Sequence, residues 1–228
     1  MNLLAIDTSS VACTVAARVG GELVERYEEQ PREHTRILMP MIREVLSGAN
    51  AQLTDLDAIV LGNGPGSFIG MRIAASVSQG LAHGAGLKII PVSSLAAVAA
   101  EVFSSSEAQL AAVAQDAHMN EVYLGLFSRG SDGLPVPESA ERLHQLGPIE
   151  ELDAADKDSR VAAGEGWKRY PDLWMLNESR FGEHSDICYP RAQYLLLLAN
   201  QCAAIDPRDI SPAYLRQKVA QIPAKPGS

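Results

Sequence analysis

Short apolar runs come first along the chain, followed by stripes of apolar residues at helical spacing. Leu3 to Ile6 is a continuous apolar run, as expected of a strand that is buried on both faces. Val11 to Val19 is rich in strand formers, and Gly20-Gly21 supplies a two-residue hairpin turn into Glu22 to Glu28. The pattern therefore predicts three strands at the start of the chain.

The next part of the chain alternates between helix and strand patterns. From Glu33 onward apolar residues fall on one helical face, and Gly48 marks the end of that helix. Two further strands and two further helices are predicted at Ile59 to Leu61, Ser67 to His83, Lys88 to Val92 and Ser94 to Phe103. Three strands followed by alternating helix and strand build a mixed sheet covered by helices. This is the element order of the ribonuclease-H-like unit.

The second half of the chain looks like a worn copy of the first. Leu110 to Gln115 and Val122 to Phe127 are strand patterns, and Pro190 to Ala204 is a late helix pattern. Asp116 follows its strand much as Asp7 follows the first strand. Two stacked copies of such a unit give the α/β architecture shared by actin, sugar kinases and Hsp70.

We therefore predict an actin-like pair of ribonuclease-H-like subdomains, with mixed sheets covered by helices. The first subdomain is expected over residues 1–102 and the degenerate second one over residues 103–228. The run Ser104 to Ser106 offers a flexible joint between them. The C-terminal segment is expected to pack back on the first subdomain.

Composition limits the classes of function. The 228 residues are 46% hydrophobic, enough to bury the core of one large domain or two ordinary ones. The formal net charge of -9 argues against binding of nucleic acid through the net field of the protein, although a basic patch stays open. The three cysteines are far apart and predict neither a disulfide framework nor a thiolate metal site. No signal-peptide or membrane-spanning pattern is found, so the expected location is the cytoplasm, with no membrane partner.

The glycine-rich stretch G-N-G-P-G-S-F-I-G-M-R-I-A-A-S, from Gly62 to Ser76, connects a predicted strand to a predicted helix. Many proteins cradle a phosphate at such a place. A Walker loop needs a lysine before Ser or Thr, but Gly66-Ser67 is followed by Phe68, and the G-x-G-x-x-G spacing also fails. What remains is a helix N-terminus with Ser67 as its cap. The glycines themselves favour a structural role in the bend.

The two predicted hairpins lack the features of a nucleotide site. Actin-like ATPases grip phosphates with two turns, each carrying an Asp and glycines that let the backbone approach closely. Asp7 to Ser10 and Asp116 to Glu121 contain no glycine. Asp7 as the holder of a metal-bound water stays open, but an Asp at a strand end more often bonds the backbone two residues on. The five histidines show no H-x-x-x-H or H-E-x-x-H spacing. We therefore predict no catalytic residue, no cofactor, no metal site and no ATP hydrolysis by this chain alone.

The helix predicted from Ser67 carries two stripes of small residues. Ser76, Gly80 and Gly84 recur every fourth position, and Gly70 with Ala74 forms a second stripe. Small residues at this spacing permit close backbone approach. Either the helix packs tightly against its own sheet, or one small face docks on a helix of a partner chain.

Five motifs spread along the whole chain resemble the TsaB (YeaZ) family. They are L-L-A-I-D-T-S at Leu3 to Ser9, P-R-E-H-T at Pro31 to Thr35, G-P-G-S-F-I-G-M-R-I at Gly64 to Ile73, D-A-x-x-x-E-V-Y at Asp116 to Tyr123, and Y-L-R-x-x-V-A at Tyr214 to Ala220. The resemblance implies an actin-like two-domain protein that is an inactive partner of a threonylcarbamoyl transferase. Its partners would be a TsaD-like catalytic subunit in a heterodimer, a TsaE-like ATPase, and tRNA through the complex.

The reaction implied by the resemblance is the transfer of threonylcarbamoyl from threonylcarbamoyl-AMP to the adenosine beside the anticodon. The tRNAs concerned read codons that start with A, and the adenosine is at position 37. The catalytic relative carries H-x-x-x-H on a helix, whereas here His34 is followed four residues on by Leu38. This departure fits a subunit without a metal.

The resemblance also implies an interface between the first helix, Glu33 to Leu46, and the helix Ser67 to His83, with a homodimer in isolation. The glycines would then shape a docking surface, and the side of the second helix with Gly70, Ile73, Ala74 and Val77 would face a partner. The expected interface residues are Arg36, Met39, Gly66, Ser67, Phe68, Gly70, Met71, Ile73, Ala74 and Val77.

Two rival functions are enzymatic. A sugar-kinase-like phosphotransferase would need glycines in the two hairpins, and a metallopeptidase would need paired metal ligands, and neither feature is present. A homodimeric scaffold that works without a TsaD-like partner is distinguished only by finding the partner.

The family usually has Thr at position 69, Gly at 74 and Arg at 118, where this chain has Ile69, Ala74 and His118.

Overall fold

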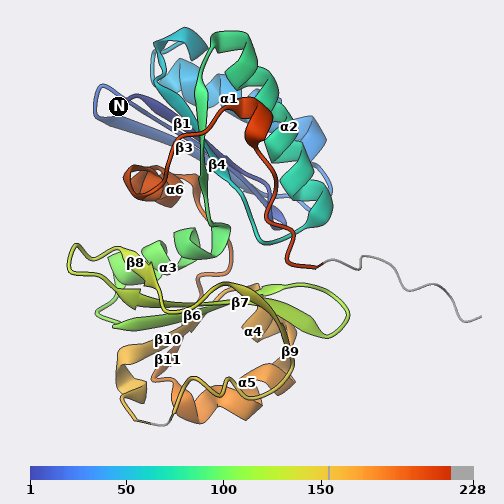
Figure 1. Cartoon of the computed structure of the whole chain (residues 1–228), viewed down its shortest axis with the longest axis vertical. Coiled ribbons are helices and arrows are strands. Elements are labelled where there is room, and N and C mark those ends of the chain that lie inside the picture. Colours follow the sequence, from blue (N-terminus) through green and yellow to red (C-terminus); the bar gives the residue numbers. More distant parts are fainter. Residues whose placement is uncertain (154, 217–228) are drawn as a thin grey trace, which may run out of the picture.

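The computed structural model of the chain describes residues 1–153 and 155–216. Figure 1 shows two lobes stacked along the long axis, each containing one sheet flanked by helices. The sheet of the first lobe has the strand order β3-β2-β1-β4-β5. The sheet of the second lobe has the order β11-β10-β6-β7-β8, and β9 pairs with β7. The α/β fold of two mixed sheets covered by helices agrees with the prediction.

The first lobe follows the predicted element order closely. β1 pairs antiparallel with β2 and parallel with β4, so the sheet is mixed. The elements are β1 (Leu3–Asp7), β2 (Ala12–Val19), β3 (Glu22–Glu29), α1 (His34–Gly48), η1 (Leu53–Asp55), β4 (Ala58–Gly62), α2 (Phe68–Ala85), β5 (Lys88–Val92) and α3 (Ser94–Ser105).

The second lobe contains several short elements that the sequence pattern did not predict. The predicted helix from Pro190 to Ala204 is shorter than expected, because α6 ends at Leu198 and a 3-10 turn follows. The elements of this lobe are β6 (Leu110–Asp116), β7 (Glu121–Arg129), β8 (Pro135–Pro137), β9 (Arg142–Gln145), η2 (Lys157–Ser159), β10 (Arg160–Ala163), α4 (Glu165–Arg169), α5 (Pro171–Asn177), η3 (Glu178–Arg180) and β11 (Glu183–His184). The last elements, α6 (Ala192–Leu198), η4 (Ala199–Gln201) and η5 (Pro207–Asp209), pack on the first lobe.

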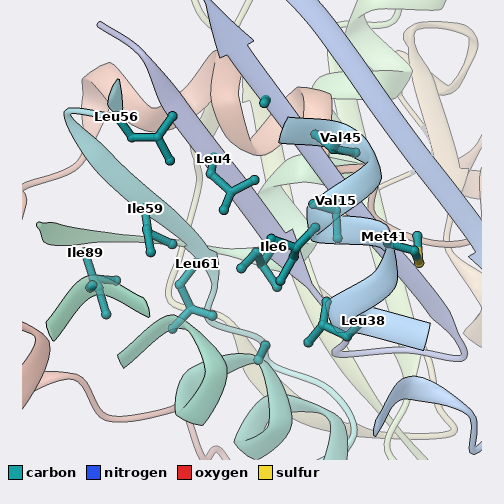
Figure 2. Packing of buried hydrophobic residues seen from close by; sticks show 14 of the residues in the cluster. Leu4, Ile6, Val15, Leu38, Met41, Val45, Leu56, Ile59, Leu61 and Ile89 are labelled. Carbon is teal, nitrogen blue, oxygen red and sulfur yellow. The ribbon is translucent and has the colours of Figure 1, made fainter. Parts of the chain in front are cut away.

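Strand β1 is buried along its whole length, as its apolar run predicts. Its Leu4 and Ile6 belong to the same core cluster as Leu38 and Met41 of α1, and Figure 2 shows Ile6 close to Leu38. Leu3 belongs to a separate cluster on the opposite face, which is covered by residues of α3 and α6. A sheet that is buried on both faces explains why no polar residue interrupts the run.

Helix α3 connects the lobes without a flexible joint. It runs through Ser105, and the hydroxyl groups of Ser104 and Ser106 donate hydrogen bonds to the carbonyls of Ala100 and Val102 at 2.7 and 2.8 Å. The run Ser104 to Ser106 therefore forms the end of α3, where the sequence pattern predicted a linker. A run of serines is therefore ambiguous in a sequence: it can form a linker, or its hydroxyls can donate to carbonyls one turn earlier at the end of a helix.

After α6, the C-terminal part of the chain runs along the first lobe and then turns toward the second. Ile205 forms two backbone hydrogen bonds with Ile89 of β5, at 3.0 and 2.8 Å. Gln79 of α2 donates to the carbonyl of Pro207 at 2.9 Å. Figure 1 shows this red segment passing α2 on its way to the second lobe. The segment therefore contacts β5 and α2 of the first lobe before it approaches the second lobe.

Candidate functional site

The G-P-G-S-F turn packs against the turn that follows β1. The backbone N–H of Ser67 donates to the carbonyl of Ser9 at 2.6 Å, and the Thr8 hydroxyl donates to the carbonyl of Gly70 at 2.7 Å. A Cβ atom at Gly66 would collide with the Ser9 carbonyl, and one at Gly70 with the Thr8 carbonyl. These glycines are therefore needed for close backbone approach inside the chain. Their contacts lie inside the chain, so any part they play in a docking surface is indirect and stays a prediction.

The exposed face of α2 is the one that carries the Ser76 stripe. Ala74 is 0% exposed and belongs to the core of the first lobe, whereas Ser76, Gly80 and Gly84 are exposed. A Cβ atom at Gly80 or Gly84 would meet open space. The expectation that Ala74 faces a partner is therefore wrong. The sheet needs a close-packed cover, and the small side chain of Ala74 lets the helix approach it.

Burial divides the ten expected interface residues into two groups. Gly66, Gly70, Met71 and Ala74 are buried and offer almost no surface to a partner. The other six remain at least partly exposed: Arg36, Met39, Ser67, Phe68, Ile73 and Val77.

A groove of about 400 Å³ lies between α1 and α2. Ile69 at its edge is 70% exposed, which is unusual for an isoleucine. The Arg72 guanidinium lies 3.8 Å from the centre of the Phe68 ring. The lining residues are His34, Thr35, Leu38, Met39, Phe68, Ile69, Arg72, Ile73, Ser76 and Val77.

The expected interface residues omitted Ile69 and Arg72, whereas Ser76 belonged to the alternative stripe of small residues. Their spacing is that of one helical face, but the same spacing fits several stripes of this apolar helix. The exposed residues of α2 can be identified only after the residues that face the sheet are known.

Asp7 shapes the turn after β1. The backbone N–H of Ser9 and the hydroxyl of Ser94 donate to its two carboxylate oxygens, each at 2.6 Å. Burial raises the pKa of the Asp7 carboxyl, against the lowering effect of these two bonds. The prediction that this Asp bonds the backbone two residues on is confirmed. Both oxygens are engaged inside the protein, which leaves the carboxylate poorly placed to bind a metal-bound water.

Asp116 has the same position in the second hairpin and is also engaged. Its carboxylate accepts from the backbone N–H of His118 at 2.8 Å and from the Tyr170 hydroxyl at 2.7 Å. The Nε of Arg169 lies 2.9 Å from its other oxygen. Three consecutive non-glycine residues of this hairpin, His118, Met119 and Asn120, have φ angles of 60°, 55° and 60°. Side chains thus hold a turn that in a phosphate-binding hairpin would be formed by glycines.

The Y-L-R motif contacts both lobes. The Tyr214 hydroxyl accepts from Nε of Arg72 at 2.9 Å, and its ring centre lies 5.1 Å from that of Phe68. Two residues on, the Arg216 guanidinium lies 2.5 Å from the Glu121 carboxylate and donates to the carbonyl of Ala117 at 2.9 Å. The motif therefore joins α2 to the second hairpin. Val219 and Ala220, the last residues of the motif, lie outside the described residues.

A cavity of about 590 Å³ lies between the two hairpins, the start of α2 and the start of α1. His34 lines it, and its Nε2 lies 2.9 Å from the carbonyl of Ser10. This bond requires the proton on Nε2, since a carbonyl can only accept. Leu38, one turn further on α1, is buried in the core. Within residues 1–153 and 155–216, no three His, Cys, Asp or Glu side chains are grouped so that they could hold a metal ion.

Sequence comparisons match this chain to a family model and to near full-length relatives. Residues 23–165 match the family TsaD, tRNA N6-adenosine threonylcarbamoyltransferase. The tRNA threonylcarbamoyladenosine biosynthesis protein TsaB of Haemophilus influenzae is 37% identical over 96% of this chain and 95% of its own length. The TsaB protein of Escherichia coli is 34% identical over 99% of this chain and 100% of its own length. This chain belongs to the TsaB family.

Structural comparison supports the same assignment. The structure of YeaZ from Pseudomonas aeruginosa has a TM-score of 0.82 and 33% identity, and it covers 94% of this chain and 99% of the other. The actin-like fold of the TsaB family is therefore the fold of this chain. Among the described residues no helix is long and apolar enough to cross a membrane.

Proposed function

We propose that this chain is the non-catalytic subunit of an assembly that makes threonylcarbamoyladenosine in tRNA. It would act with a TsaD-like catalytic subunit and a TsaE-like ATPase in the cytoplasm. The reaction would be transfer of threonylcarbamoyl from threonylcarbamoyl-AMP to adenosine 37 of tRNAs that read codons starting with A. Near full-length similarity to relatives named for threonylcarbamoyladenosine biosynthesis carries the proposal.

The geometry of the two hairpins supports a role without chemistry. The Asp7 carboxylate is enclosed by bonds to the chain itself, and Asp116 is bound by Arg169 and Tyr170. A phosphate-bound cation would have to displace these partners from the carboxylates before it could bind. We infer that the chain contributes a binding surface and leaves the reaction to its partner.

The proposed partner surface is the groove between α1 and α2 together with its rim. Its core is the apolar lining with Phe68, Ile69, Ile73 and Val77, and Arg36 stands exposed on α1. Interfaces of this kind combine aromatic and aliphatic anchors with arginine. The heterodimer with a TsaD-like subunit and the homodimer in isolation would use the same surface and would exclude each other.

Reconstitution of the reaction tests the proposed function. A TsaD-like subunit, a TsaE-like ATPase, threonylcarbamoyl-AMP and tRNA are combined with and without this chain, and modified adenosine is measured by mass spectrometry. Modification is expected only when the chain is present. Full product yield without it would contradict the proposal, as would product formed by this chain with tRNA and threonylcarbamoyl-AMP alone.

A substitution on the exposed face of α2 tests the surface. Ser76→Arg places a long charged side chain at the groove, so it should weaken binding of a TsaD-like subunit at least tenfold by calorimetry and shift the homodimer to monomer. The control is Ser131→Arg, because Ser131 is exposed in the second lobe and does not line the groove. Both variants should keep the circular dichroism of the unchanged protein. Equal affinity of the two variants would remove the groove from the interface.

A further inference from the structure

A separate cavity of about 520 Å³ lies between the lobes, on the side of β8 and α6. Figure 1 shows β8 beside α3, with α6 above them. The wall is mainly apolar and is supplied by both lobes: Val92, Ala96, Phe127, Pro135, Pro137 and Leu198. None of these residues lines the groove between α1 and α2.

One carboxylate stands in this apolar wall. Glu141 lines the cavity, and its Oε1 accepts a hydrogen bond from the Ser93 hydroxyl. Within residues 1–153 and 155–216, no Lys, Arg or His forms an ion pair with Glu141, and no Lys, Arg or His lines the cavity. Burial raises the pKa of the Glu141 carboxyl to about 7. The carboxylate is thus half-buried without a counter-charge, which is an unfavourable arrangement for a charged group.

The other titratable group of the wall does not supply a charge. Cys202 lines the cavity, and burial raises the pKa of its thiol, so the thiol is neutral at pH 7. Ser139 and Gln201 are the remaining polar side chains beside Ser93. Glu141 therefore sets the charge of the cavity.

Capping of α3 accounts for only part of this arrangement. The Ser93 side chain caps the helix by accepting from the backbone N–H of Ala96 at 3.0 Å, and its hydroxyl donates a hydrogen bond to Oε1 of Glu141. This chain of bonds engages Oε1, and the described residues provide no hydrogen bond to Oε2 of Glu141. One carboxylate oxygen is left for a donor that enters the cavity.

We propose that this cavity is a binding site for a small organic ammonium ion. Its ammonium group would donate to the Glu141 carboxylate, and its apolar part would lie against Phe127 and Leu198. A charge-assisted bond of this kind is about twice as strong as a neutral one, and it gives the carboxylate the counter-charge that it lacks. The volume of about 520 Å³ lies within the range of small-molecule sites. The proposal is independent of the proposed role in tRNA modification.

Phenethylamine and its neutral analogue 2-phenylethanol are the probes of choice. They are titrated into the full chain and followed by calorimetry and by NMR shifts of residues that line the cavity. Phenethylamine should bind saturably at pH 8, and 2-phenylethanol at least tenfold more weakly. Glu141→Gln should weaken binding of the amine at least tenfold and leave binding of the alcohol unchanged. The matched control Glu138→Gln removes the same charge from an exposed side chain outside the cavity and should bind the amine like the unchanged protein.

The pH dependence of the unchanged protein gives a second measurement. The ionised fraction of Glu141 increases through its pKa of about 7, while the amine stays charged. The affinity of the protein for phenethylamine should therefore rise about tenfold from pH 6 to pH 8. Equal binding of amine and alcohol, or a flat profile over this range, would overturn the proposal. Amine binding that survives Glu141→Gln, or shifts confined to residues outside the cavity, would also do so.

Discussion

At the scale of single residues, the glycines of α2 divide into two kinds that look alike in the sequence. Gly70 lies against the carbonyl of Thr8, which is backbone and cannot rotate away, whereas Gly80 faces open space. Gly70→Ala should therefore lower the free energy of unfolding by about 1–3 kcal/mol through overpacking. Gly80→Ala should raise it by about 0.5–1 kcal/mol, because alanine is the better helix former.

Urea denaturation of the two glycine variants measures both changes. The pair is matched, since each adds one methyl group to the same helix. An unchanged or increased stability of Gly70→Ala would mean that the contact between the G-P-G-S-F turn and the turn after β1 is looser than the structure indicates. The residue scale also explains why Ala74→Arg is unsuited to testing the interface: its side chain would enter the core, so loss of binding would follow from unfolding.

At the scale of elements, the junction of α3, β3 and α6 contains a carboxyl group whose charge opposes folding. Burial raises the pKa of Glu101 to about 7. The nearby Arg191, at the start of α6, forms its ion pair with Glu25 of β3, with Nη2 2.5 Å from Oε2. Between pH 4.5 and 7 the folded state therefore binds more protons at Glu101 than the unfolded state does. Because the folded state holds the extra proton, the free energy of unfolding falls as pH rises through this range.

Glu101→Gln should remove the contribution of this group to the pH dependence. Because Glu101 is only partly buried and solvent screens its charge, the unchanged protein should lose on the order of 1–2 kcal/mol of stability through Glu101 between pH 5 and pH 8. Thermal unfolding across this range should show a smaller loss for Glu101→Gln, and the variant should be the more stable protein at pH 8. The control is Glu107→Gln, which changes an exposed glutamate just beyond α3 and should keep the slope of the unchanged protein. An equal slope for Glu101→Gln and the unchanged protein would contradict the assignment.

At the scale of the whole molecule, the segment from Tyr214 to Arg216 joins the proposed partner surface to the second hairpin. Arg216 is largely buried between Glu121 and the carbonyl of Ala117, and Tyr214 packs on Phe68. Arg216→Ala removes the ion pair with Glu121 and the hydrogen bond to the Ala117 carbonyl, the two contacts through which this segment holds the hairpin. It should lower the free energy of unfolding by about 1–3 kcal/mol and speed amide hydrogen exchange from Ala117 to Tyr123.

Hydrogen exchange with mass spectrometry locates the effect of Arg216→Ala. The control is Arg208→Ala, since Arg208 is exposed and pairs with Asp206 two residues away; it should change stability by less than about 0.5 kcal/mol. Exchange in the second hairpin that stays as slow as in the unchanged protein would show that this segment does not hold the hairpin.

The sequence by itself determined the elements whose pattern is long or continuous. The apolar run from Leu3 to Ile6, the helical stripe of α1 and the Asp-containing turns each depend on local spacing or local hydrogen bonds, so they could be predicted without knowing the neighbours. The motifs at Gly64 to Ile73 and Tyr214 to Arg216 also indicated the family, which the comparisons confirm.

Only the tertiary structure decided which side of α2 is exposed and which short segments become strands. Ala74 and Ser76 are both small, and nothing local distinguishes them; the sheet buries Ala74 because α2 crosses β1 and β4 on that side. Strands as short as β8 and β11 carry too few residues for a period to show, and they form because β7 and β10 offer free edges to pair with. Burial and pairing are relations between distant segments, so a pattern within one segment cannot contain them.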